Sequence, residues 1–104
     1  MVFVTAPSEE TALDIAKTLV DERLAACVNV VPRITSVYTW EGKREVSAES
    51  LLLIKTRGER YDALQQRVLE VHPYSVAEVL AVPVEAGAPA YLDWVRDSVT
   101  GEGR

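Results

Sequence analysis

The chain has 104 residues, 48% of them hydrophobic and 26% charged, and a formal net charge of −5 at pH 7. This length fits a single compact domain over residues 1–104 and is too short for two. The acidic balance argues against a nucleic-acid partner, which requires a basic face, and gives no reason to expect binding to a membrane. The first ten residues lack the basic and long apolar regions of a secretory signal, so a cytoplasmic location is expected.

The N-terminal part of the chain predicts a strand followed by an amphipathic helix. Val2–Val4 is a short apolar stretch, and Ser8 stands where a helix N-cap is expected. Glu9 and Glu10 follow it, and the helix dipole favours their negative charge in the first turn. Apolar residues then recur at helical spacing as far as Leu24, which predicts a helix of roughly four turns.

The middle of the chain predicts a long β-hairpin. β-branched and aromatic residues dominate residues 25–40, and Pro32 interrupts them, so a bulge or bend is expected there. Residues 41–43 (EGK) contain the glycine that a tight hairpin turn favours. The returning arm ends in LLLIKT, residues 51–56, and its continuous apolar run is typical of a central strand.

The remaining residues predict a helix, a strand and a second helix. The helix beginning near Tyr61 must end near His72, because Pro73 cannot continue it. A strand is expected over Glu78–Val84, and Pro89 suits the first turn of a C-terminal helix. The resulting order, β-α-β-β-α-β plus a terminal helix, predicts an α+β, ferredoxin-like fold with two helices on one face of an antiparallel sheet.

The hairpin arms are long for a domain of this size. Residues 25–40 would reach roughly 50 Å if fully extended, whereas the radius of gyration of such a domain is only ~13 Å. Either the hairpin bends at Pro32 and packs on its own helix, or its tip projects with Tyr38 and Trp40 exposed. A projecting tip would expose strand edges and aromatic surface that further copies of the chain could cover.

Four segments resemble the CutA family of divalent-cation tolerance proteins, in the same order and spacing. They are DERLAACVNVVPRITSVYTWEGK, ESLLLIKT, HPYSVAEVLAVPV and YLDWV. The resemblance implies a ferredoxin-like subunit, a homotrimer built through strand edges, and binding of copper(II) or another divalent cation without an organic cofactor. It also implies a cytoplasmic bacterial protein linked to metal tolerance.

Three residues are candidate metal ligands, namely His72, Cys27 and Glu78. Histidine is the commonest metal ligand, but a histidine at the end of a helix can equally bond the free carbonyls there. Cys27 is the only cysteine, and it is either a small buried apolar residue or a soft ligand facing a cleft between subunits. Glu78 could join His72 through the intervening turn. Some family members carry further candidate ligands at positions that are Val4 and Val71 here.

A second group of residues is expected to line a cleft between subunits. Glu49 and Lys55 lie six residues apart on one predicted strand, so they face the same side. Trp40 is expected to anchor the interface, because aromatic residues dominate such contacts. The complete group is Tyr38, Trp40, Glu49, Lys55, Tyr74 and Trp94.

These features favour a metal-responsive binding trimer over an enzyme. Acylphosphatases share the element order but need a phosphate-holding arginine after the first strand, and residues 5–8 (TAPS) contain none. A Cys27–His72 nucleophile pair would need a third, orienting group, which the sequence does not indicate. The alternative is a regulatory trimer that binds a small anion or nucleotide between subunits, as the PII signalling proteins do. The scattered glycines form no phosphate-binding loop that would support it.

Overall fold

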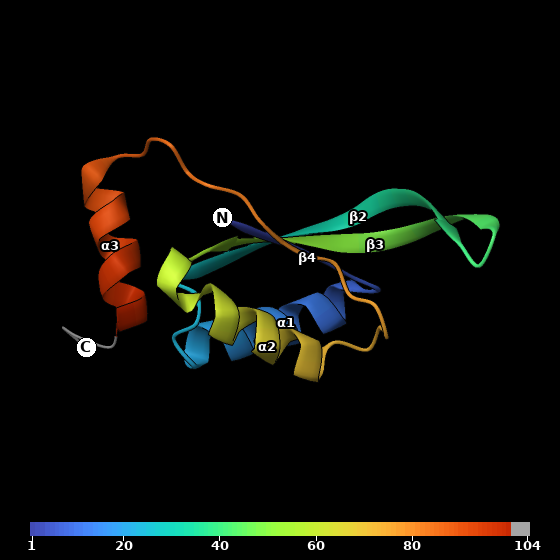
Figure 1. The fold of residues 1–104 in the computed structure, drawn as a ribbon, viewed down its shortest axis with the longest axis horizontal. Helices are drawn as coiled ribbons and strands as arrows, with labels where there is room; N and C mark the ends of the chain where they lie inside the picture. Colours follow the sequence, from blue (N-terminus) through green and yellow to red (C-terminus); the bar gives the residue numbers. More distant parts are fainter. Residues whose placement is uncertain (101–104) are drawn as a thin grey trace.

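The computed structural model describes residues 1–100 and has the predicted ferredoxin-like fold (Figure 1). Its antiparallel sheet has the strand order β2-β3-β1-β4. The last four residues of the predicted domain, 101–104, lie outside the described residues. The elements are β1 (Val2–Ala6), α1 (Glu9–Asp21), β2 (Cys27–Trp40), β3 (Lys43–Lys55), the 3-10 turn η1 (Gly58–Arg60), α2 (Tyr61–Val71), β4 (Val79–Ala81) and α3 (Pro89–Thr100).

The core lies between the sheet and the helices α1 and α2, which cover the same face. Burying each large aliphatic side chain stabilises the fold by about 1.5–3 kcal/mol, so this layer dominates stability. The opposite face of the sheet, called the open face below, carries the alternate side chains of the same strands. The largest fully buried side chains are Ile15, Leu19, Leu52, Ile54, Leu64, Val2, Val4 and Val68.

Helix α1 begins as predicted and ends earlier than its apolar pattern suggests. The Ser8 hydroxyl accepts the backbone N–H of Thr11 at 3.1 Å, which makes Ser8 the N-cap. At the other end the Arg23 N–H bonds the Val20 carbonyl and the Leu24 N–H bonds the Leu19 carbonyl, with Arg23 at φ 59°. This Schellman motif turns the chain while keeping Leu24 against the core, which explains why Leu24 fitted the helical spacing.

The tip of the β2–β3 hairpin projects beyond the helices and beyond the other two strands (Figure 1). Of the two predicted alternatives, the projecting tip is therefore the one observed. Pairing shifts by one residue between Val31, which faces Leu51, and Ile34, which faces Glu49. The predicted bulge is therefore present at Pro32 and Arg33, and Arg33 adopts φ 58°. The hairpin accounts for the elongated shape, with extents of 48 × 27 × 21 Å.

Strand β4 is shorter than the predicted Glu78–Val84. Only Val79–Ala81 pairs with β1 as a strand, and two further bonds join Val82 to Met1. The Val82 N–H donates to the Met1 carbonyl at 2.8 Å, and the Met1 amino group donates to the Val82 carbonyl at 3.2 Å. The strand stops there because Pro83 has no N–H to donate. The predicted end at Val84 was wrong because apolar residues continue past Ala81 although Pro83 interrupts the pairing.

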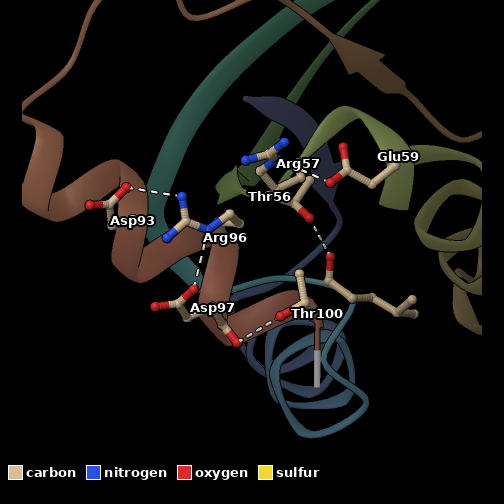
Figure 2. Close-up of polar contacts among 8 residues, drawn as sticks. Thr56, Arg57, Glu59, Asp93, Arg96, Asp97 and Thr100 are labelled. Carbon is tan, nitrogen blue, oxygen red and sulfur yellow. Dashed lines mark hydrogen bonds and ion pairs between the residues drawn. The ribbon is translucent and has the colours of Figure 1, made fainter. Parts of the chain in front are cut away.

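Helix α3 packs at the end of the molecule opposite the hairpin tip (Figure 1). Val95 and Val99 bury their side chains against Ala26, next to the start of β2. Figure 2 shows Arg96 of this helix bonded to Asp93 at 3.1 Å and Asp97 at 3.2 Å. These surface ion pairs add little stability, so the apolar cluster holds the helix in place. Within residues 1–100, none of the helices has the length and apolar character needed to cross a membrane.

Candidate functional site

A hollow of about 660 Å³ lies on the open face, where the hairpin arms meet the turn after α2. It is called the Glu49 hollow below. Thr5 comes from the end of β1, Tyr38 and Trp40 come from β2, and the turn after α2 contributes Tyr74 and Glu78. The side chains that the argument uses are Thr5, Tyr38, Trp40, Glu49, Tyr74 and Glu78.

The bulge in β2 places two aromatic residues in this hollow. Before the bulge, even-numbered residues of β2 such as Val30 face the core opposite Leu52. One extra residue reverses this alternation, because side chains in a strand point to opposite faces in turn. Tyr38 and Trp40 consequently share the open face with Glu49.

Glu49 is a carboxylate with little access to water, since only 8% of the residue is exposed. The Tyr74 hydroxyl donates to its Oε2 at 2.9 Å and is its only hydrogen-bond donor within residues 1–100. Burial raises the pKa of Tyr74 to about 12, helped by this hydrogen bond, by the charge of Glu49 and by Tyr38. A buried carboxylate that has only one uncharged hydrogen-bond donor favours the binding of a cation, because the cation compensates its charge.

His72 is buried behind the hollow, with both ring nitrogens engaged. Its Nε2 lies 2.7 Å from the Thr5 carbonyl oxygen, and the Tyr74 N–H donates to its Nδ1 at 3.1 Å. The carbonyl can only accept and the amide can only donate, so the ring is neutral and carries its proton on Nε2. His72 thus occupies the edge of β1 beyond the end of β4 and holds the turn that presents Tyr74.

One chain does not bring the three predicted metal ligands together. Cys27 is paired with Lys55, whereas His72 contacts Thr5, whose partner in β3 is Leu51, about 13 Å along the strand. Glu78 lines the Glu49 hollow. Within residues 1–100 we find no group of three His, Cys, Asp or Glu side chains arranged to hold a metal ion. Metal binding by these residues stays a prediction.

Cys27 instead lies beside Tyr91 of helix α3. Burial raises the pKa of Tyr91, and the charge and hydrogen bond of Cys27 act in the same direction. The thiol is half-buried at the start of β2, where Ala26 packs on α3. Cys27 is therefore next to the junction between the sheet and α3, remote from the Glu49 hollow.

The structure brings together four of the six residues predicted to line a cleft. Tyr38, Trp40, Glu49 and Tyr74 border the Glu49 hollow. Lys55 shares their face but lies six residues along β3 from Glu49, about 20 Å away, and Trp94 lies on α3. Residue patterns could not have indicated the Thr5 carbonyl, because it is a backbone group.

Comparison with known proteins identifies the family. The family described as CutA1 divalent ion tolerance protein matches residues 1–98. The divalent-cation tolerance protein CutA of Thermus thermophilus is 50% identical over 98 residues, which are 94% of this chain and 95% of that protein. The protein CutA homolog of Xenopus laevis is 54% identical over 97 residues, covering 93% of this chain. The chain spans 64% of that relative and 59% and 52% of the mouse and human CutA proteins.

Solved structures agree with this assignment. The Thermus thermophilus protein matches with a TM-score of 0.92 at 50% identity, covering 94% of this chain and 95% of that one. The protein described as periplasmic divalent cation tolerance protein CutA from Archaeoglobus fulgidus matches with a TM-score of 0.92 at 41% identity and the same coverage. A rice relative is described as chloroplastic, so the compartment differs among relatives, and the cytoplasmic location of this chain stays a prediction. The chain belongs to the CutA1 family of divalent ion tolerance proteins.

Proposed function

We propose that this CutA1 family member is a cation-binding homotrimer without catalytic activity, and that the cation binds in the Glu49 hollow. The observation that carries the proposal is the carboxylate of Glu49, which is 8% exposed and receives one hydrogen bond, from an uncharged hydroxyl. A cation would offset the cost of keeping this charge away from water. Glu78 adds a second carboxylate to the same hollow.

Copper(II) is the divalent ion we expect, but one chain fits it poorly. Copper prefers nitrogen and sulfur ligands. Both nitrogens of His72 are engaged and Cys27 lies at the other end of the sheet, so one chain offers mainly Glu49 and Glu78. We therefore propose that copper binding is modest and draws its remaining donors from water or from a second subunit.

Exposed apolar side chains on the hairpin support assembly. Val37 and Val46 are paired across the hairpin and are 63% and 62% exposed, and Trp40 is 47% exposed. Val37 and Val46 lie on the face of the hairpin opposite Trp40, so both faces expose apolar side chains, and such surfaces on soluble proteins mark interaction sites. A contact between the hairpin of one copy and a different surface of the next is heterologous, and such contacts form a ring where the rotation between copies closes. A neighbouring copy on the hairpin would also cover the mouth of the Glu49 hollow.

The charge of the hollow weighs against the alternative of a trimer that binds a small anion or nucleotide. Of the described residues that line it, Glu49 and Glu78 are acidic and none is basic. An anion would meet like charges there without a compensating lysine or arginine. A nucleophilic mechanism lacks support as well, because Cys27 lies beside Lys55 whereas His72 contacts Thr5, which pairs with Leu51 about 13 Å along β3.

Sedimentation equilibrium tests the assembly. We expect a mass of about three times the 11.5 kDa of one chain. Trp40→Ala should weaken the trimer, whereas Leu13→Ala, which truncates an exposed residue of α1, should leave it unchanged. A monomer that persists at micromolar concentration would overturn the proposal.

A further inference from the structure

We infer that the Glu49 hollow binds an organic cation, with an alkylammonium group at Glu49 and its alkyl stem against Tyr38, Trp40 and Tyr74. The inference rests on the proposed function only in treating the hollow as a cation site. It goes further by naming a ligand class that the aromatic walls select. A metal ion would contact only the carboxylates of the hollow and would leave its three aromatic side chains without a role.

The charge of the site fits an ammonium group. Tyr74 occupies Oε2 of Glu49, and within residues 1–100 no hydrogen bond reaches Oε1. An ammonium nitrogen has up to three N–H donors and no acceptor, so it can bond Oε1 without losing the Tyr74 contact. Glu78 on the same hollow adds to the attraction.

The walls of the site fit the alkyl part of the same ligand. Tyr38, Trp40 and Tyr74 all line the hollow, and an ammonium group is attracted to the face of such rings, most strongly to tryptophan. Two of the rings are held in place, because the Tyr38 hydroxyl lies 3.3 Å from the Ser47 hydroxyl and the Tyr74 hydroxyl bonds Glu49. A site whose rings are already ordered loses less entropy on binding.

The size of the hollow also exceeds what a metal ion needs. Its volume of about 660 Å³ lies within the range of small-molecule sites, roughly 300–1,000 Å³. One water molecule takes only about 30 Å³ in the liquid, so an amine with several carbons can enter. The open mouth makes room for either a free amine or a lysine side chain from a second copy.

Tryptophan fluorescence can report binding directly, because Trp40 lines the hollow and the only other tryptophan, Trp94, lies on α3. In Trp94→Phe, Trp40 is the only tryptophan, and Trp40→Phe supplies the matched control. We expect butylammonium chloride to change Trp40 emission saturably at pH 7.5. Butanol, which has the same stem without the charge, should do so at least tenfold more weakly. Equal responses to butylammonium and butanol would overturn the inference without any further substitution.

Charge substitutions then locate the site. In the Trp94→Phe protein, Glu49→Gln should weaken butylammonium binding by at least about tenfold. Glu45→Gln is the matched control, because Glu45 lies on the same strand and face but outside the hollow, and it should change affinity by less than about twofold. Equal affinity in the Glu49→Gln and parent proteins would contradict the inference.

Sedimentation with and without butylammonium separates the two sources of the cation. Unchanged mass on binding supports a free amine as the ligand, whereas a falling mass supports a side chain of a second copy as the resident cation. A monomer that still binds the amine would contradict the trimer and leave this inference standing. A trimer that binds copper(II) but not butylammonium up to 50 mM, roughly fifty times a weak Kd of 1 mM, would overturn this inference alone.

Discussion

Replacing His72 with alanine should destabilise the protein, because the ring holds the turn after α2. If His72 were only a metal ligand, its removal from the metal-free protein would cost little stability. The residue is 8% exposed, and its ring makes two hydrogen bonds, one to the Thr5 carbonyl and one from the Tyr74 N–H. Leaving a buried donor or acceptor unsatisfied costs about 1–3 kcal/mol per group. Since water can reach part of the vacated space, we expect a total loss of about 2–4 kcal/mol.

Two conservative variants divide this loss between the two bonds. Asparagine can place its side-chain oxygen near the position of Nδ1 and accept the Tyr74 N–H, as in an Asx turn. Glutamine can place its amide nitrogen near Nε2 and donate to Thr5. His72→Asn and His72→Gln should each retain roughly half of the stability that His72→Ala loses, about 1–2 kcal/mol.

Urea unfolding at pH 7.5 measures these differences at fixed protein concentration, since assembly would otherwise shift the midpoint. A loss below about 0.5 kcal/mol for His72→Ala would refute the reasoning. An increase in the free energy of unfolding would refute it as well. It would mean that the folded protein is destabilised by the ring, as expected for a metal ligand in the absence of the metal.

Two further predictions concern Tyr74 and the hairpin turn. In a spectroscopic titration, Tyr74 should ionise at about pH 12, in a late phase that Tyr74→Phe removes and Glu49→Gln moves toward 10. As the pH rises, the unfolded chain releases this proton before the folded protein does. The stability that the bond contributes is therefore complete below pH 10 and declines as the pH rises toward about 12. A Tyr74 that titrates at 10 in the folded protein would contradict this. At the turn, Glu41 and Gly42 have φ of 52° and 79°, so Glu41→Asn should slow amide exchange at the hairpin tip by about two- to fivefold and Gly42→Ala should accelerate it about tenfold. Nothing lies within 4 Å of a Cβ added at Gly42, so backbone strain alone is being measured, and unchanged exchange in both variants would count against the turn geometry.

The order of elements could be predicted because each boundary has a local chemical cause. Ser8 caps α1, Pro73 ends α2, and Pro89 begins α3. The apolar pattern extends past the end of two elements, the helix α1, whose predicted length of roughly four turns is correct, and the strand β4, whose predicted length was wrong. Leu24 is apolar because it packs on the core after the helix has turned, and apolar residues continue through Val84 although Pro83 interrupts the pairing of β4 with β1.

The arrangement of the site was less accessible to sequence reasoning. Pro32 indicated a bulge, but the effect of the bulge on Tyr38 and Trp40 depends on the register with β3, which pairs Ile34 with Glu49. The position of His72 depends on a backbone carbonyl at Thr5, which has no signature in the sequence. Lys55 and Glu49 share a face, as alternation predicted, yet alternation gives no limit on their separation along the strand.

Anomalous diffraction from crystals of the assembled protein soaked in copper(II), recorded at the copper absorption edge, tests the central claim most directly. The claim is that cations bind at Glu49 and that His72 holds the turn beside it. We predict an anomalous peak in the Glu49 hollow, within about 2.5 Å of a carboxylate oxygen, with His72 still bonded to Thr5. A peak on a ring nitrogen of His72 or on the Cys27 sulfur, with the Glu49 hollow empty, would contradict it.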